Sequence, residues 1–572
     1  MSDGVRAGLP TVRVEHDAEC TVRDGTILRA DVFRPEEPGT YPVLLMRTPY
    51  GKTHSQSESG YHHASWFASH GYVVVVQDCR GRWASDGEFV PFLNEAGDGY
   101  DTIEWAAALP ESSGKVGMYG YSYPGLVQLL AAAARPPSLA AICPGFTSSQ
   151  AYDGWIYSHG AIFLGWAMTW ALFLAHDTAR RNGDDEVLRA VRAALLHVTD
   201  EYWTLPLCDL APLEARGLPS YYRDWLDHPT HDDYWKRWSI DADYSRLAVP
   251  ALHFTGWYDG FLRGTVDNYI GMRAAGHAEQ RLVVWPWTHE PWTPVWGSND
   301  SNLGFMSADD VHLAWFDRLL KGTGEAEAAV STYILHDGWR DFPDWPPPET
   351  RPRELYLRSG GRANSRHSDG TLSAQAPGDE PADVYTYDPD LPTWSAGGHS
   401  CCDASVTPMG PEPQDAAEST KAVLVYTSEP LAGDVTLAGS VEVVLYAAST
   451  AVDTDFVARL CAVDRDGTSR NLQEGLVRAR YRNGFEAPEP LVPGEPVGYR
   501  LRLGPVGIRI PRGYRLRVDI ASSDFPLWDR NLNSGGPIGK EGASAGRVAV
   551  QTVFHDAARP SRVVLPVLEG AL

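Results

Sequence analysis

Residues 115–125 read K-V-G-M-Y-G-Y-S-Y-P-G and hold the strongest structural signal in the chain. The apolar run Val116–Tyr119 predicts a buried strand, and the alanine-rich run Leu126–Ala134 predicts a helix. Between them stands Ser122, with Gly120 and Gly125 on either side. A strand, a glycine-flanked serine and a helix in this order are typical of a nucleophile elbow, a tight turn that lifts a serine hydroxyl clear of a sheet.

The spacing of this motif is G-x-S-x-x-G, because Pro124 occupies the position where the second glycine usually falls. The string alone is also typical of an ordinary turn serine. The strand before it and the helix after it favour the catalytic interpretation.

Length and charge limit the architecture and the partners. The 572 residues are too many for one core and predict roughly three or four domain-sized units. The formal net charge is −25, so phosphate groups would be repelled. We therefore expect neither nucleic acid nor a membrane as a partner.

The seven cysteines include no C-x-x-C pair, which predicts a reducing compartment, no disulfide framework and no metal site. The adjacent Cys401 and Cys402 are expected to be small buried residues. The first residues lack a signal-peptide pattern, and the apolar run Ala161–Ala175 is too short to span a bilayer. We expect a buried helix at this run and a cytoplasmic protein.

The first part of the chain alternates strands with helices. Residues 11–35 predict two antiparallel strands around a turn, and further strands are expected at Pro42–Met46, Tyr72–Val76 and Ala140–Cys143. A helix is expected at Thr102–Ala108. This alternation predicts a mainly parallel α/β sheet.

The pattern then changes twice. Residues 150–245 carry helical patterns at 158–181 and 184–201, which predict an inserted helical cap. Strand patterns then return at Ala251–Thr255 and Arg281–Trp285. They are followed by a capped helix at Asp309–Lys321. The stretch Pro343–Pro348 predicts a linker, and the short alternating strands beyond it predict an all-β jelly roll. The expected fold is an α/β-hydrolase domain (1–149 and 246–345), a helical cap (150–245) and a jelly roll (350–572).

A serine hydroxyl needs a base and a carboxylate that orients the base. In α/β-hydrolases these groups follow in the order Ser, Asp or Glu, His, at the ends of successive strands. Asp259 follows the strand Ala251–Thr255, and His289 follows the strand Arg281–Trp285. Ser122, Asp259 and His289 are therefore the predicted catalytic triad.

The tetrahedral intermediate also needs hydrogen-bond donors aimed at its oxyanion. The backbone N–H of Tyr123 is one candidate, because it directly follows the nucleophile. The second should come from the loop after Pro42–Met46, which contains Tyr50. From the residues alone, an oxyanion donor and a packed loop aromatic are equally good interpretations of Tyr50.

Several motifs together resemble the CocE/NonD hydrolases, a family that includes cocaine esterases, α-amino-acid ester hydrolases and X-Pro dipeptidyl peptidases. The motifs are R-T-P-Y at 47–50, D-C-R-G at 78–81, S-D-G at 85–87, G-Y-S-Y-P-G at 120–125, W-Y-D-G-F at 257–261, P-W-T-H at 286–289 and D-F-P-L-W-D-R-N-L-N at 524–533. The resemblance runs almost from end to end. It implies the triad named above and assigns the Tyr50 hydroxyl, with the Tyr123 N–H, to the oxyanion hole.

Two departures separate the chain from parts of that family. Amino-ester hydrolases carry acidic residues after the triad aspartate, whereas Gly260-Phe261-Leu262 stands here. X-Pro peptidases usually carry an extra N-terminal domain, whereas the hydrolase strands start near residue 11 here. An aromatic-lined acyl pocket of Trp155, Trp166 and Phe261 is expected instead, although each of the two tryptophans is equally well explained by packing within the cap.

The resemblance implies a serine esterase that works through an acyl-enzyme, without a cofactor, on a small-molecule acyl ester. The same apparatus would also serve an amidase, a β-lactam acylase, an X-Pro peptidase or an acyltransferase, and the residues do not separate these. A further alternative is a jelly roll that binds carbohydrate or a partner beside a vestigial hydrolase. The sequence leaves open the natural substrate and whether the chain forms a homodimer.

Overall fold

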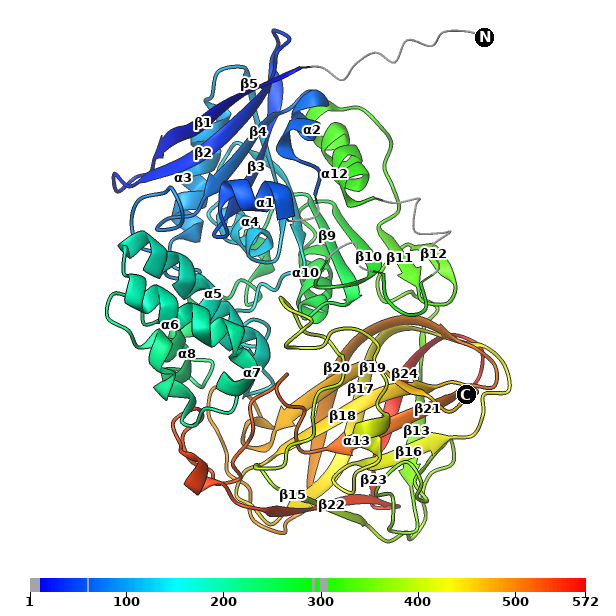
Figure 1. Cartoon of the computed structure of the whole chain (residues 1–572). Helices are drawn as coiled ribbons and strands as arrows, with labels where there is room; N and C mark the ends of the chain where they lie inside the picture. Colours follow the sequence, from blue (N-terminus) through cyan, green and yellow to red (C-terminus); the bar gives the residue numbers. More distant parts are fainter. Residues whose placement is uncertain (1–10, 59–60, 291–293, 299–306) are drawn as a thin grey trace.

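The computed structural model describes residues 11–58, 61–290, 294–298 and 307–572. Figure 1 shows a sheet with flanking helices, a helical lobe beside it, and an all-β part packed against both.

The first sheet has ten strands in the order β1-β2-β4-β3-β5-β6-β9-β10-β11-β12. The seven from β4 to β11 in this order are parallel, and β1, β2 and β12 are antiparallel additions at the two edges. In chain order the strands are β1 Val12–Thr21, β2 Ile27–Pro35, β3 Tyr41–Thr48, β4 Val73–Asp78, β5 Ser112–Tyr121, β6 Leu139–Gly145, β9 Ala251–Tyr258, β10 Gln280–Thr288, β11 Val330–Ile334 and β12 Gly338–Phe342. The predicted parallel sheet is confirmed, whereas β11 and β12 were not predicted.

Helices cover both faces of this sheet because alternate side chains of a strand point to opposite faces. Val73 and Val75 of β4 pack in the core with α3 and α4, whereas Val74 and Val76 pack in the core with α2 and α12. The helices beside the sheet are α1 Lys52–Glu58, α2 Ala64–Ser69, α3 Glu95–Ala107, α4 Tyr123–Ala133, α10 Leu262–Ala275 and α12 Ala308–Phe316, which continues as a π-helical turn over Asp317–Lys321.

A helical insertion lies between β6 and β9. It contains α5 Leu164–Asn182, α6 Asp185–Leu196, α7 Val198–Glu201, α8 Tyr221–Asp227 and α9 Asp233–Lys236. The helix predicted from residue 158 begins later, because β7 Tyr157–Ser158 and β8 Ala161–Ile162 form a small hairpin. Among the described residues, no helix has the length and apolarity that a membrane crossing requires.

The all-β part is one extended sheet that folds around a shared core. All its strand pairs are antiparallel except β14 with β16. Its strands are β13 Arg351–Arg358, β14 Thr371–Ser373, β15 Asp383–Tyr387, β16 Leu424–Ser428, β17 Val435–Ser449, β18 Asp455–Val463, β19 Ser469–Arg478, β20 Val497–Ile510, β21 Arg515–Ala521, β22 Ala549–Asp556, β23 Arg559–Pro560 and β24 Arg562–Glu569, with one short helix, α13 Asp415–Glu418.

The all-β part docks directly on the end of β9 and on the loop that follows it. The indole of Trp257 packs so closely on Gly507 of β20 that a Cβ there would lie 2.1 Å from the ring. Asp259 pairs with Ser400 through a β-bridge. Trp345, in the expected linker, is buried and lies 5.7 Å from Trp257 between ring centroids. The proline-rich stretch is therefore part of the packed contact between the two parts.

Candidate active site

Ser122 sits at the junction of β5 and α4 in a backbone conformation rare for a residue with a side chain, with φ 65° and ψ −128°. The neighbouring glycines are needed for space. A Cβ on Gly120 would lie 2.6 Å from Pro124, and one on Gly125 would lie 2.5 Å from the carbonyl oxygen of Gly145. The glycine three residues after the serine therefore lets α4 approach β6, as expected of the elbow.

A buried glutamine, Gln128, ties this turn to the sheet. Its amide nitrogen donates to the carbonyl oxygens of Gly120, Pro124 and Cys143, and its amide oxygen accepts from the Cys143 N–H. Gln128 was not predicted, although it is the single polar side chain in the apolar run Leu126–Ala134. A lone polar residue in such a run needs partners, because an unpaired buried amide is costly.

The structure brings the three predicted triad residues together. The Nδ1 atom of His289 lies 2.7 Å from Oδ1 of Asp259, and its Nε2 atom lies 3.2 Å from Oγ of Ser122. All three side chains are buried. The carboxylate can only accept, so the Nδ1–H donates to Asp259 and Nε2 is left to accept the serine proton.

Asp259 has two further donors that fix its carboxylate. The Thr255 hydroxyl donates to Oδ2 at 2.6 Å, and the backbone N–H of Phe261 donates to Oδ1 at 3.0 Å. Together with His289 they fix the orientation of the carboxylate. Thr255 was not predicted; it lies in β9, four residues before the aspartate, and a polar residue near the end of a buried strand is the signal that could have found it.

Tyr50 lies at the same site, on the loop after β3. Its hydroxyl accepts a hydrogen bond from the indole N–H of Trp170 at 3.2 Å, and its side chain interacts with Ser122. Burial raises the pKa of Tyr50 well above its usual value, so the phenol stays protonated and can donate. Tyr123 is the first residue of α4, where a backbone N–H has no acceptor within the helix.

Buried polar residues of the D-C-R-G-R stretch hold the Tyr50 loop in place. Arg82 donates to the carbonyl oxygen of Pro49 and to that of Leu174 in α5, both at 2.9 Å. Asp78 accepts the backbone N–H of Lys52 at 2.6 Å, and burial raises its pKa to about 6. The loop is thus fixed from the sheet and from the helical insertion.

A cavity of about 670 Å³ opens at Ser122 and His289. It lies where the sheet, the helical insertion and the all-β part meet, and its walls are largely aromatic and apolar. Among its lining residues are Met46, Tyr50, Tyr61, Tyr121, Trp170, Phe173, Leu195, Glu290, Cys402 and Asp403.

The predicted acyl pocket of Trp155, Trp166 and Phe261 needs correction. These three rings pack on one another, with centroids 4.5–5.3 Å apart, and Phe261 also lies 5.3 Å from the His289 ring. None of them lines the cavity at Ser122, which Trp170 and Phe173 line instead. The three residues form the packed support behind the histidine.

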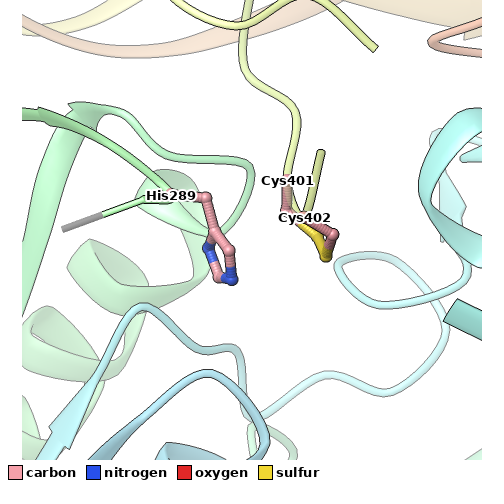
Figure 2. Close-up of side chains that lie close together, drawn as sticks. All are labelled: His289, Cys401 and Cys402. Carbon is pink, nitrogen blue, oxygen red and sulfur yellow. A yellow bond between two sulfur atoms is a disulfide. The ribbon is translucent and has the colours of Figure 1, made fainter. Parts of the chain in front are cut away.

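The prediction that the adjacent cysteines are small buried residues holds for Cys401 but not for Cys402. Cys401 and Cys402 form a disulfide with each other, and Cys402 is exposed at the cavity. Figure 2 shows this disulfide beside the imidazole ring of His289. A search for spaced cysteine pairs misses a bond between neighbours. His62 and His63, a second pair of adjacent metal-ligand residue types, are exposed, and the His63 side chain caps the start of α2.

The chain is similar to known hydrolases over nearly its whole length. It matches the profiles of the X-Pro dipeptidyl-peptidase (S15 family) over residues 24–291 and of the X-Pro dipeptidyl-peptidase C-terminal non-catalytic domain over residues 321–564. It is 36% identical over 568 residues to the cocaine esterase of Rhodococcus sp. (strain MB1 Bresler), covering 96% of this chain and 97% of the relative.

Two solved structures share the fold. An α-amino acid ester hydrolase labelled with selenomethionine superposes with a TM-score of 0.82 at 24% identity, covering 98% of this chain and 97% of the other. An aminopeptidase from the marine sediment archaeon Thaumarchaeota archaeon gives a TM-score of 0.80 at 23% identity, with the same coverage. A hydrolase-type domain followed by an all-β domain is therefore the architecture of this chain.

Proposed function

Because the chain belongs to the CocE/NonD family of serine hydrolases, we propose that it is a carboxylesterase that works through Ser122, His289 and Asp259. One observation carries this proposal: His289 lies within hydrogen-bond distance of both other residues, 2.7 Å from the Asp259 carboxylate and 3.2 Å from the Ser122 hydroxyl. Ser122 and His289 also line a cavity of about 670 Å³. A buried base beside a strained, cavity-lining serine is the arrangement that acyl transfer requires.

In the proposed reaction, Nε2 of His289 takes the proton of Ser122 as the serine oxygen attacks the acyl carbonyl. The Asp259 carboxylate stabilises the imidazolium that forms. The Tyr50 hydroxyl and the Tyr123 N–H donate to the oxyanion. The imidazolium then protonates the departing alcohol, and a water molecule, activated by the same histidine, releases the acid.

The cavity walls suggest a substrate with a bulky apolar acyl group. The cavity is lined by Trp170 and Phe173 of α5, by Leu195 of α6 and by Met46 of β3. We assign residues 150–245 to a cap over the hydrolase domain (1–149 and 246–345). Residues 350–572 are assigned to a jelly roll whose Cys402 and Asp403 close one side of the site.

The proposal is tested by comparing p-nitrophenyl esters with the matching anilides, from acetyl to benzoyl and phenylacetyl, for the wild type and Ser122→Ala. The variant should lower kcat for esters by about 10⁴-fold or more. Ser69→Ala, on α2 and outside the cavity lining, is the control. A fluorophosphonate should label the wild type at Ser122 and leave Ser122→Ala unlabelled.

The outcomes separate the alternatives that share the triad. Ester turnover that depends on Ser122, with little anilide cleavage, supports the esterase. Comparable anilide turnover supports an amidase or acylase instead. Labelling of Ser122 without hydrolysis of either substrate supports an acyltransferase. Ester turnover that survives Ser122→Ala overturns the proposal.

A further inference from the structure

The Cys401–Cys402 disulfide occupies a wall of the active site. Cys402 lines the cavity that contains Ser122, whereas Cys401 lines a 10 Å³ void on the other side, together with Trp166 and Phe261. One ligand atom from each of Cys401, Cys402 and His289 lies within 4.8 Å of the others. Figure 2 shows the two cysteines and the imidazole facing each other across this short gap.

The backbone around the cysteines is anchored independently of the disulfide. The Ser400 carbonyl oxygen accepts from the Gly260 N–H at 3.2 Å, and the Cys401 carbonyl oxygen accepts from the Thr407 hydroxyl at 3.4 Å. Gly398 exchanges two backbone hydrogen bonds with Gly410. Opening the sulfur–sulfur bond would therefore leave both thiols beside His289.

His289 is oriented as a metal-ligating histidine would be. Its Nδ1–H donates to the Asp259 carboxylate, so Nε2 carries a lone pair directed into the site. Carboxylate–histidine pairs of this kind fix the ring and raise its basicity toward a cation. Two thiolates and one imidazole form a donor set that suits Zn²⁺ and similar thiophilic cations.

We propose that reduction of the Cys401–Cys402 disulfide creates a Zn²⁺ site with His289 Nε2 that switches the hydrolase off. A dithiol reductant supplies two electrons and two protons, leaves as its own disulfide, and releases both cysteine thiols. The thiols then lose their protons as Zn²⁺ binds. The cation occupies the Nε2 lone pair, so His289 can no longer take the proton of Ser122.

The inhibitory half of this proposal rests on the proposed function of the triad, whereas the binding half does not. Co²⁺ is therefore the first probe, because sulfur-to-cobalt charge transfer reports thiolate ligands directly, without any need for activity. The experiment titrates Co²⁺ into full-length protein that is either oxidised or reduced with a phosphine and freed of excess reductant. Zn²⁺ inhibition of ester hydrolysis is measured in the same two samples.

Reduced wild type should bind one Co²⁺ with charge-transfer absorption, and the oxidised protein should not. Cys402→Ser should weaken this binding by at least about tenfold, since even outer-shell changes at metal sites cost about 10–100-fold. Cys208→Ser is the matched control, because Cys208 is a partly exposed free cysteine in the helical insertion, outside the cavity lining. Its spectrum should equal that of the wild type.

Three results would overturn the site: no charge-transfer absorption in reduced wild type, equal absorption in Cys402→Ser, or loss of absorption in Cys208→Ser. Circular dichroism of each variant shows that it is folded. If Co²⁺ binds as expected while no ester is hydrolysed in either redox state, the metal site stands and the proposed function fails. If esters are hydrolysed and Zn²⁺ affects both redox states equally, the switch is refuted.

Discussion

The indole N–H of Trp170 donates to the hydroxyl of Tyr50 across 3.2 Å and joins the helical insertion to the loop after β3. Both residues also line the cavity at Ser122. Because the phenol accepts this bond, its own proton is left to point elsewhere, and the Ser122 side chain is its neighbour. The insertion therefore contributes to the direction of a candidate oxyanion donor as well as to the pocket wall.

Trp170→Phe should keep an aromatic ring, although a smaller one, at this position and remove the indole N–H. We expect kcat/KM for a short ester to fall about fivefold, because a net hydrogen bond contributes about 1 kcal/mol. Tyr50→Phe should cost about 10²–10³-fold in kcat, as expected for an oxyanion donor. In a double-mutant cycle, Trp170→Phe should cost nothing further in the Tyr50→Phe background.

The control for this cycle is Trp166→Phe. Trp166 lies one turn earlier on α5, and its indole N–H donates to the Trp155 carbonyl oxygen instead of to Tyr50. The change in kcat/KM caused by Trp166→Phe should be the same in the wild type and in the Tyr50→Phe background. A full Trp170→Phe loss in the Tyr50→Phe background would show that Trp170 acts through the pocket wall alone.

Phe173→Ala should alter substrate preference, because this half-exposed ring lines the cavity. We expect kcat/KM for a phenylacetyl ester to fall about tenfold, which is about 1.4 kcal/mol and just below the roughly 1.5–3 kcal/mol of a fully buried side chain, because this ring is only half buried. The value for an acetyl ester should stay within about twofold. Leu196→Ala is the matched control, since Leu196 is 82% exposed on α6 and lies outside the lining. An equal loss for both esters would contradict a role in acyl selection.

The spacing of strands and loops in the sequence was sufficient to predict Ser122, Asp259 and His289 as neighbours. Each residue ends or follows a short apolar run, and parallel strands bring such positions to one edge of a sheet. The same logic predicted a loop at this edge that contains Tyr50, whereas the role of Tyr50 as an oxyanion donor was implied only by the resemblance to the CocE/NonD hydrolases. The predicted positions of these residues depend only on local sequence patterns, namely apolar runs and the residues that follow them, which any chain needs in order to form such a sheet.

The lining of the cavity could not be predicted in the same way. Helix α5 is buried on most of its circumference from Leu164 to Ala175, so no polar face indicates which side meets the cavity. Trp166 and Trp170 are four residues apart and stack on each other, yet only Trp170 reaches the lining. That choice depends on how the insertion sits over the sheet, which is a tertiary property.

Gly125→Ala tests whether the elbow motif needs its second glycine, which stands one position later than in the usual G-x-S-x-G spacing. The added Cβ would lie 2.5 Å from the Gly145 carbonyl oxygen, so α4 must move away from β6. We expect the free energy of unfolding to fall by about 1–3 kcal/mol, the usual cost of overpacking. Activity should fall too, because α4 begins beside Ser122.

Gly97→Ala in α3 is the control for that substitution, since nothing lies within 4 Å of a Cβ there. It should stabilise the protein by about 0.5–1 kcal/mol, as alanine does in a helix interior. Urea unfolding curves and ester kinetics of both variants provide the comparison. Equal stability of Gly125→Ala and the wild type would mean that the close approach of α4 to β6 is dispensable.

The last prediction concerns His399, which the all-β part places against the end of β9, just before Asp259. Its Nδ1 lies 2.8 Å from Oε1 of Glu474, and its Nε2 lies 2.8 Å from the carbonyl oxygen of Trp257. Both partners accept, so the ring is doubly protonated. Although burial opposes the charge, Glu474 raises the pKa of His399 above its usual 6.5.

A histidine whose pKa is raised on folding stabilises the native state in full below the unfolded pKa, and this contribution is lost as pH rises through the folded pKa. Above about pH 6.5 the free energy of unfolding should therefore fall more steeply for the wild type than for His399→Gln. His253→Gln is the control in the part of this range above about pH 7.5, because burial lowers the pKa of the folded His253 to about 4 and the unfolded imidazole is also mostly neutral there. His253→Gln should change the free energy of unfolding without changing the slope of this energy against pH. Identical slopes for the wild type and His399→Gln would show that His399 is neutral in the folded protein.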